Sequence, residues 1–301
     1  MNNNHCTSYT GGRIGNFGNE SSAEVERKHT IVQSLWTKPI TDYKRLRETL
    51  FLAALSLEYA HRSGYKVNMH TDSLGVRLLR NFGYDKLCST LASIPSSVPV
   101  DLFAAGKFYA MRAEGIGKVH VDIDVLLKKP GILDRFYTNR FIDCICQMEE
   151  DMPQVSHANI ITSMFQLGYP AATRPNWNGS MNTGVVGFNN PILAARYMNN
   201  YFDALKMYTK DVFDKYKAEN PGAWMAFDFI LEQVNLSCMS VGYNACTLLP
   251  TKEPSIVADK IGYQHLQGFY KWSDQPIIKR ELQRLNPELY MKVIRNFAFI
   301  E

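Results

Sequence analysis

Short apolar segments alternate with helical segments along the first half of the chain, and this alternation limits the folds open to it. Thr30–Leu35 and Tyr65–His70 are apolar segments of strand length. Between them, Arg45–Arg62 carries apolar residues at helical spacing, and Gly64 follows as a stop signal. Further helices are predicted over 74–81 and 102–113, and further strands over 118–127 and 141–148. Strands that alternate with helices in this way predict an α/β fold with a mixed, mostly parallel central sheet.

The second half is less regular but continues the same kind of structure. We expect a strand over Thr183–Phe188, helices over 191–209, 223–235 and 287–296, and one or two strands within 236–249. Residues 1–27 are rich in Asn, Gly and Ser and lack apolar periodicity, which is typical of a flexible polar tail. Because no linker-like segment interrupts residues 28–301, we expect them to form a single domain.

Composition excludes several classes of protein. The net charge is +4 over 301 residues and the basic residues are scattered, which is not typical of a nucleic-acid-binding protein. No apolar run approaches the ~20 residues that a transmembrane helix needs, although peripheral membrane contact stays open. The six cysteines show no CxxC spacing and the N-terminus has no signal-peptide pattern. We therefore expect a cytoplasmic protein.

One segment carries charges where a buried strand should have none. Residues 118–127 read KVHVDIDVLL, so that apolar residues alternate onto one face, while His120, Asp122 and Asp124 fall on the other. A buried carboxylate is costly unless it is paired or binds a metal. Two carboxylates at i and i+2 offer adjacent oxygen ligands for a divalent cation.

Three segments in order along the chain resemble motifs of a known family. Gly117–Pro130, with Asp122-Ile-Asp124, resembles the DxD strand of GT-A glycosyltransferases, especially glycosyltransferase family 8. His265-Leu-Gln-Gly268-Phe-Tyr-Lys271-Trp272 resembles that family's HxxGxxKPW motif without its proline. Met181–Asn189 resembles its Asn-x-Gly strand. Together these segments extend the resemblance over residues 117–272, and the first strands and helices extend it to about residue 30.

The resemblance implies a fold, a reaction and its cofactors. It implies a GT-A (Rossmann-like) fold and a metal-dependent transferase that moves a hexose from a UDP-sugar with retention of configuration. Because only Asp228 or Glu232 could serve as a nucleophile for a double displacement and neither is convincing, we expect UDP itself to act as the base. The expected metal is Mn²⁺ or Mg²⁺, and a mixed oxygen and nitrogen ligand set suits Mn²⁺ better. The acceptor would be a carbohydrate, a lipid-linked molecule or a protein. Its contacts are expected in the 150–180 loop.

The same resemblance implies roles for the residues of these motifs. Asp122 would contact the metal and the ribose, while Asp124 and His265 would bind the metal. Lys271 would hold the β-phosphate of the leaving diphosphate and would thereby assist catalysis. Gly268 would allow the backbone to approach the phosphates. His120 lies on the carboxylate face and competes with His265 as a ligand, although a packing role is the better interpretation.

The remaining candidates have weaker motifs. Asn182 would contact the donor sugar or the acceptor, although a role as a strand cap explains it equally well. Asp228 lies on a predicted helix near the place where the family has an acidic residue beside the reactive sugar, with Glu232 as the alternative. An exposed position on an amphipathic helix explains Asp228 equally well. At the cofactor end, Trp36 and Ser34 would lie beside the uracil, with Asp72 placed near them by topology alone.

Two other classes of function use a similar site. A nucleotidyltransferase would use the same carboxylates and metal to attack an α-phosphate, but it should have a basic, glycine-rich loop after the first strand. Residues 35–39 read LWTKP and do not supply that loop. A non-catalytic nucleotide-sugar-binding protein is the other alternative, and such a protein has no reason to retain Asp122, Asp124, His265 and Lys271 together.

Overall fold

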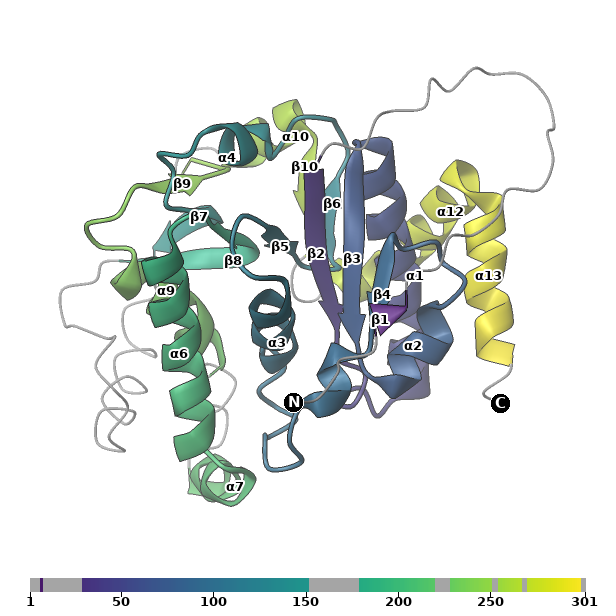
Figure 1. Ribbon diagram of the computed structural model, residues 1–301. Coiled ribbons are helices and arrows are strands. Elements are labelled where there is room, and N and C mark those ends of the chain that lie inside the picture. Colours follow the sequence, from purple (N-terminus) through teal and green to yellow (C-terminus); the bar gives the residue numbers. More distant parts are fainter. Residues whose placement is uncertain are drawn as a thin grey trace. The chain divides into compact units, whose positions relative to one another are not determined.

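The computed structural model describes residues 6–7, 29–151, 179–219, 228–250, 254–266 and 270–298 (Figure 1). The chain divides into two compact units. Unit 1 is drawn from Met1–Ser93, Val121–Ile132 and Ala258–Glu301, and unit 2 from Ile94–His120 and Leu133–Val257. Both contain helices and strands, with parallel and antiparallel strand pairs. The predicted α/β class is therefore confirmed.

A mostly parallel sheet forms the centre of unit 1. β2 (His29–Leu35) pairs in parallel with β3 (Tyr65–Thr71), which pairs in parallel with β4 (Lys86–Cys88). The short β1 (Cys6–Thr7) adds to β4 in the antiparallel direction, and the rest of the expected tail lies outside the described residues. Because Leu35 pairs with Thr71, the carboxyl ends of β2 and β3 lie at the same edge.

Helix α1 (Tyr43–Arg62) supports the strands of unit 1 and begins where Asp42 accepts a hydrogen bond from the Lys44 amide at 2.9 Å. Its leucines, alanines and Phe51 are buried, and it packs against β3 and β6 (Val125–Leu127). It also contacts two C-terminal helices, which lie beside it in Figure 1. These are α12 (Gln275–Leu285) and α13 (Pro287–Ala298), each with a proline in its first turn. Two smaller elements complete this region, α2 (Ser73–Leu79) and the 3₁₀ turn η1 (Thr90–Ser93).

The continuous strand expected over 118–127 is wrong. The segment forms two short strands, β5 (Val119–Val121) and β6 (Val125–Leu127), separated by a turn that carries both aspartates. The Val125 amide donates to the Asp122 carbonyl at 3.0 Å and closes this turn. β6 then pairs with β10 (Tyr263–His265) in an antiparallel ladder. The break takes the carboxylates out of a regular strand, where their burial would be costly.

Unit 2 is built on three strands and an aromatic core. β7 (Cys144–Asp151) pairs antiparallel with β8 (Gly179–Phe188), with a bulge between Cys146 and Met148, and parallel with β9 (Ala245–Thr247). The helices of unit 2 include α3 (Ala105–Glu114), α4 (Asp134–Thr138), α6 (Pro191–Met207), α7 (Lys210–Glu219) and α9 (Asn235–Met239). In the aromatic core, Phe108 of α3 stacks on Tyr201 of α6 with their ring centroids 3.6 Å apart. The chain reaches unit 1 through α10 (Pro254–Ile261), and α11 (Tyr270–Ser273) follows β10.

The helix expected over 223–235 is confirmed from residue 228, where the described part begins, but Ile230–Val234 form a π-helical segment, η2. Residues Asn235–Met239 are helical, so a strand beginning at 236 is wrong, and the strand of this region is β9. Most of the 150–180 loop lies outside the described residues. Within the part of the chain that the structure describes, every helix is too short or too polar to cross a lipid bilayer.

Candidate functional site

The turn between β5 and β6 brings Asp122 and Asp124 next to His265 of β10. The β6–β10 ladder places His265 opposite Val125, and the Leu266 amide donates to the Asp124 carbonyl at 2.9 Å. As a result, one ligand atom from each of the three side chains lies within 4.8 Å of the others. Residues distant in the sequence thus form one carboxylate–carboxylate–imidazole cluster in unit 1.

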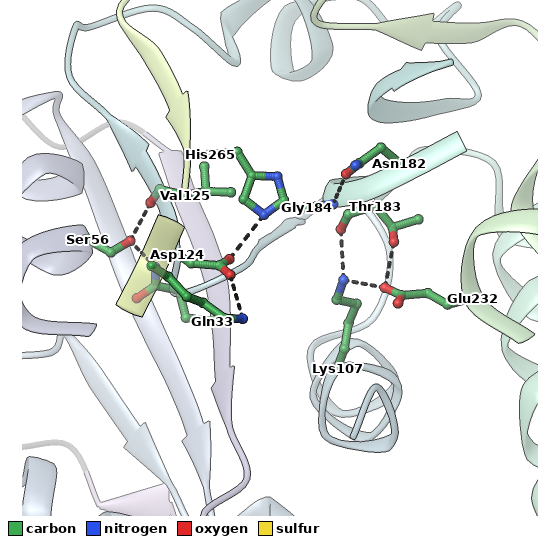
Figure 2. A network of polar contacts seen from close by, with 11 residues as sticks. Gln33, Ser56, Lys107, Asp124, Val125, Asn182, Thr183, Gly184, Glu232 and His265 are labelled. Carbon is green, nitrogen blue, oxygen red and sulfur yellow. Dashed lines mark hydrogen bonds and ion pairs between the residues drawn. The ribbon is translucent and has the colours of Figure 1, made fainter. Parts of the chain in front are cut away.

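Asp124 lies between two basic groups. Its Oδ1 lies 3.2 Å from His265 Nε2 (Figure 2). Its Oδ2 accepts from Lys271 Nζ at 3.3 Å. Burial alone would raise the pKa of Asp124, but hydrogen bonds and charge interactions with His265 and Lys271 outweigh it and lower the pKa to about 2. Asp124 is therefore ionised at neutral pH, the state in which a carboxylate binds a metal.

Lys271 reaches the cluster from the short helix α11. Gln275 Nε2 donates to the Lys271 carbonyl at 2.8 Å, which ties α11 to the start of α12. Lys271 Nζ also lies 5.5 Å from the centre of the Trp272 ring. Gly268, expected to approach the phosphates, lies outside the described residues. The ammonium of Lys271 is thus positioned on the same carboxylate as the imidazole.

The donor set fits a divalent cation. Asp122, Asp124 and His265 supply hard carboxylate oxygens and one imidazole nitrogen, a combination that Mn²⁺ and related ions accept. The metal-ligand residues expected from the sequence therefore converge. The competing histidine, His120, belongs to unit 2 and is buried; within the described residues, the three-residue cluster is formed with His265.

The residues expected at the nucleobase end all belong to unit 1 and lie at or just after the carboxyl ends of β2 and β3. Ser34 lies in β2, and the buried Trp36 follows that strand. Asp72 follows β3 and accepts from the Thr37 amide at 2.9 Å, the Thr37 hydroxyl at 2.7 Å and the Lys38 amide at 3.1 Å. It also caps α2 through the Gly75 amide at 2.9 Å. Asp72 therefore holds the loop after β2 in place.

A second polar cluster lies in unit 2 and was not anticipated from the sequence. Lys107 of α3 forms a buried ion pair with Glu232 of η2 and donates to the Thr183 carbonyl at 2.8 Å (Figure 2). The Thr183 hydroxyl donates to Glu232 at 2.6 Å. The sequence signal that could have indicated this cluster is Lys107 itself, which lies inside an apolar helical segment. A lysine that is buried there needs an anionic partner.

Asp228 and Asn182, the candidate catalytic residues of unit 2, are both buried. Asp228 accepts from the Ala104 amide at 2.7 Å and from the Tyr201 hydroxyl at 3.0 Å, so it caps the start of α3. Burial and the neighbouring Glu232 charge raise the pKa of Asp228 to about 7. Asn182 Oδ1 accepts from the Gly184 amide at 2.9 Å within β8. The exposed position considered for Asp228 is wrong.

The fold and the cluster define an α/β protein with a carboxylate–imidazole site suited to a divalent cation. The chain belongs to DUF6734, a family of unknown function, whose model matches residues 29–296. No curated protein matches the chain.

Several solved glycosyltransferase structures are similar to the chain at low sequence identity. The bifunctional glycosyltransferase WbbM is 12% identical with a TM-score of 0.43, over 92% of this chain and 52% of that one. The glycosyltransferase GlyE of Streptococcus pneumoniae TIGR4 is 11% identical with a TM-score of 0.40, over 92% and 64%. The galactosyltransferase LgtC is 15% identical with a TM-score of 0.32, over 72% of each chain. The chain thus spans about half the length of WbbM and less than two thirds of GlyE.

Proposed function

We propose that this protein is a metal-dependent glycosyltransferase that transfers a hexose from a UDP-sugar to an acceptor with retention of configuration. One observation carries the proposal. Asp122, Asp124 and His265 converge, and Lys271 contacts the same Asp124 carboxylate. A divalent-cation site with an adjacent ammonium is suited to a diphosphate, which is both a metal ligand and an anion.

Asp122, Asp124 and His265 would hold Mn²⁺ or Mg²⁺. When bound, the ion would neutralise negative charge on a departing diphosphate. The protein's own contribution is to keep Asp124 ionised, through His265 and Lys271, and to fix His265 on the β6–β10 ladder. In this arrangement Lys271 would bind the β-phosphate as a compact cation.

The buried carboxylates of unit 2 support a mechanism without a protein nucleophile. A double displacement would need a carboxylate close to the anomeric carbon. Both oxygens of Asp228 accept hydrogen bonds, and Glu232 is engaged by Lys107 and Thr183. We therefore propose that the acceptor attacks the face from which UDP departs and that UDP takes its proton. Asp228 and Asn182 remain proposed contacts of the reacting sugar.

The uracil would bind near the carboxyl end of β2. Ser34 and Trp36 lie at this end, and Asp72 fixes the loop that follows through Thr37 and Lys38. Ligands of parallel α/β sheets bind at such strand ends. Asp72 would then act on the nucleotide through the loop that it holds.

The wider biological setting is also part of the proposal. We propose that residues 28–301 act together as one GT-A catalytic domain, with a carbohydrate, lipid-linked or protein acceptor. We also propose a cytoplasmic location, because the spacing of the six cysteines along the sequence is not that of a disulfide-rich secreted protein.

A screen of UDP-sugars for Mn²⁺-dependent hydrolysis tests the function without knowledge of the acceptor. The purified chain is incubated with UDP-glucose, UDP-galactose and other UDP-hexoses, and UDP release is measured with and without Mn²⁺. We expect one donor to be hydrolysed in a metal-dependent manner. Asp124→Asn and His265→Ala should abolish this release while the circular dichroism spectrum is retained.

Asp203→Asn serves as the matched control, since Asp203 is an exposed aspartate that pairs with Lys206 on α6. It should hydrolyse the donor at the wild-type rate. Full turnover by Asp124→Asn in excess chelator would contradict the proposal. Release of pyrophosphate from UTP and a sugar phosphate, without UDP-sugar hydrolysis, would instead identify a nucleotidyltransferase.

A further inference from the structure

A chain of two buried hydrogen bonds runs from the central sheet of unit 1 to the strand that follows the aspartates (Figure 2). Gln33 Nε2 of β2 donates to Ser56 Oγ of α1 at 2.8 Å, and Ser56 Oγ donates to the Val125 carbonyl at 2.7 Å. Gln33, Ser56 and Val125 are all buried, with at most 1% of each residue exposed. Val125 directly follows Asp124, so the chain of bonds ends beside a proposed metal ligand.

The hydrogen bond from Ser56 to the Val125 carbonyl lies at the edge of β6 that faces away from β10. Along a strand, the carbonyls of alternate residues point to the same edge. Asp124 accepts from the Leu266 amide on the β10 side, whereas the carbonyls of Val125 and Leu127 point the other way and accept from Ser56 and Ser63. Ser56 of α1 and Ser63, which directly follows α1 as its C-cap residue, therefore take the place of a neighbouring strand at this edge.

Gln33 determines how the Ser56 hydroxyl is oriented. A hydroxyl has one hydrogen to donate, and the Gln33 amide N–H occupies its acceptor side. The hydrogen of Ser56 is thereby directed to Val125. The Oε1 atom of Gln33 is buried and has no hydrogen-bond partner within the described residues. An amide that is only half satisfied is unfavourable in a core, which indicates that its contact with Ser56 matters for the site.

We propose that Ser56, oriented by Gln33, is a positioning residue that fixes the turn carrying Asp122 and Asp124 in its metal-binding geometry. The inference rests on the proposed metal site. Both edges of β6 are held in place. Ser56 donates to one edge, and β10, which carries His265, pairs with the other edge. Loss of the Ser56 bond leaves the Val125 carbonyl without this partner, so the turn and the aspartates on it can shift relative to His265. Partners beyond the ligands themselves affect metal affinity in this way.

Ser63, the C-cap residue at the end of α1, provides a matched control. Its hydroxyl donates to the Leu127 carbonyl at 2.5 Å, so it makes the same kind of bond to the same strand edge. Leu127 pairs with Tyr263, at the end of the ladder away from His265. Ser63→Ala should therefore destabilise the protein about as much as Ser56→Ala and leave the metal-binding geometry unchanged.

Mn²⁺ binding to the full chain, measured by isothermal titration calorimetry, tests the role of Ser56. We expect Ser56→Ala to weaken Mn²⁺ binding roughly tenfold, at the lower end of the effects seen for such supporting residues. Gln33→Met should weaken binding less, and the double variant should match Ser56→Ala because both residues act through one bond. Ser63→Ala should bind Mn²⁺ as the wild type does. Equal affinities in Ser56→Ala and Ser63→Ala would overturn the inference.

Hydrogen exchange of the Leu266 amide gives a second measurement that needs no metal. This amide donates to Asp124, so it reports on the turn directly. It should exchange faster in Ser56→Ala than in Ser63→Ala or the wild type, and an unchanged rate would overturn the positioning role. If the wild type fails to bind Mn²⁺, the proposed metal site is wrong, and the exchange rate alone then decides whether Ser56 fixes the turn.

Discussion

Lys107 of α3 and Glu232 of η2 form an ion pair in the interior of unit 2, where each residue is 6% exposed. The Thr183 carbonyl and hydroxyl complete the network, accepting from Lys107 and donating to Glu232. Glu232 lies within a π-helical segment, an insertion that is frequent at functional sites. Because both charges are desolvated, the loss of either leaves the other uncompensated.

Lys107→Met should therefore lower the free energy of unfolding by about 3–5 kcal/mol, the range for a broken buried ion pair. Glu232→Gln should have a similar effect, because Lys107 would then be buried without its anion. The double variant should lose less than the sum of the two single losses, since no unpaired charge remains. Urea denaturation of the four proteins measures each term of this cycle.

The exposed pair Lys206–Asp203 on α6 is the control for this cycle. Lys206→Met should change the free energy of unfolding by no more than about 1 kcal/mol, as for other surface ion pairs. Additive losses in the Lys107 and Glu232 variants would show that the two groups are not coupled.

Deprotonation of Asp228 should lower the free energy of unfolding as the pH rises from about 4 to 7. The pKa of Asp228 is raised to about 7 in the folded chain, against an ordinary value of 3.8. Between these values the native state binds more protons than the unfolded state, so deprotonation favours unfolding. The slope is at most about 1.4 kcal/mol per pH unit. Asp228→Asn removes this contribution, so its stability relative to the wild type should increase across the same range.

Urea denaturation at several pH values between 4 and 8 measures this difference. An asparagine can accept from the Ala104 amide and donate to the Tyr201 oxygen, which keeps the cap of α3 in place. Asp203→Asn, at an exposed position, should follow the wild-type pH profile. A constant difference between Asp228→Asn and the wild type would mean that Asp228 is already ionised at pH 4.

The sequence was most informative where one local rule decided the structure. The helix expected over 45–62, with Gly64 as its stop signal, corresponds to α1, and the apolar strands β2 and β3 lie close to their expected limits. The cluster of Asp122, Asp124 and His265 could be anticipated because three segments that resemble motifs of one family follow one another along the chain. For the helix and the strands the signal lay within a few neighbouring residues, whereas the cluster required segments far apart in the sequence.

Other features that depend on contacts between distant segments were not predicted. β6, which begins after the break at the aspartates, pairs with β10, and no local pattern near Asp122 indicates this pairing. Likewise, Ser56 appeared as one small residue in an apolar helix, although its hydroxyl serves Val125. The amphipathic pattern around Asp228 left an exposed position open beside the functional role, because helical periodicity does not reveal a buried cap.

Lys271→Met should weaken UDP binding more than Mn²⁺ binding. Lys271 contacts Asp124 but contributes no metal ligand to the cluster, and its ammonium is proposed to bind the β-phosphate. Hydrogen bonds to charged groups contribute about 1.5–3 kcal/mol, so UDP affinity should fall roughly 10- to 150-fold. Calorimetric titrations with Mn²⁺ alone and with UDP in saturating Mn²⁺ separate the two effects.

Lys260→Met, at an exposed lysine of α10, is the control and should bind both ligands normally. UDP affinity that is unchanged in Lys271→Met would argue against a role in holding the diphosphate. An equal loss of Mn²⁺ and UDP binding would instead show that Lys271 mainly supports Asp124.

Asp72 should contribute more to stability than Asp42, although each caps a helix. Asp42 is exposed and accepts from the Lys44 amide, whereas the buried Asp72 serves Gly75, Thr37 and Lys38 together. Asp42→Ala should cost about 0.5–2 kcal/mol, the usual range for a helix cap. Asp72→Ala should cost about 1–3 kcal/mol more, because the Thr37 amide and hydroxyl lose their acceptor in a buried setting. Thermal unfolding of both variants makes the comparison, with Asp72→Asn expected in between; equal losses would mean that the loop after β2 does not depend on Asp72.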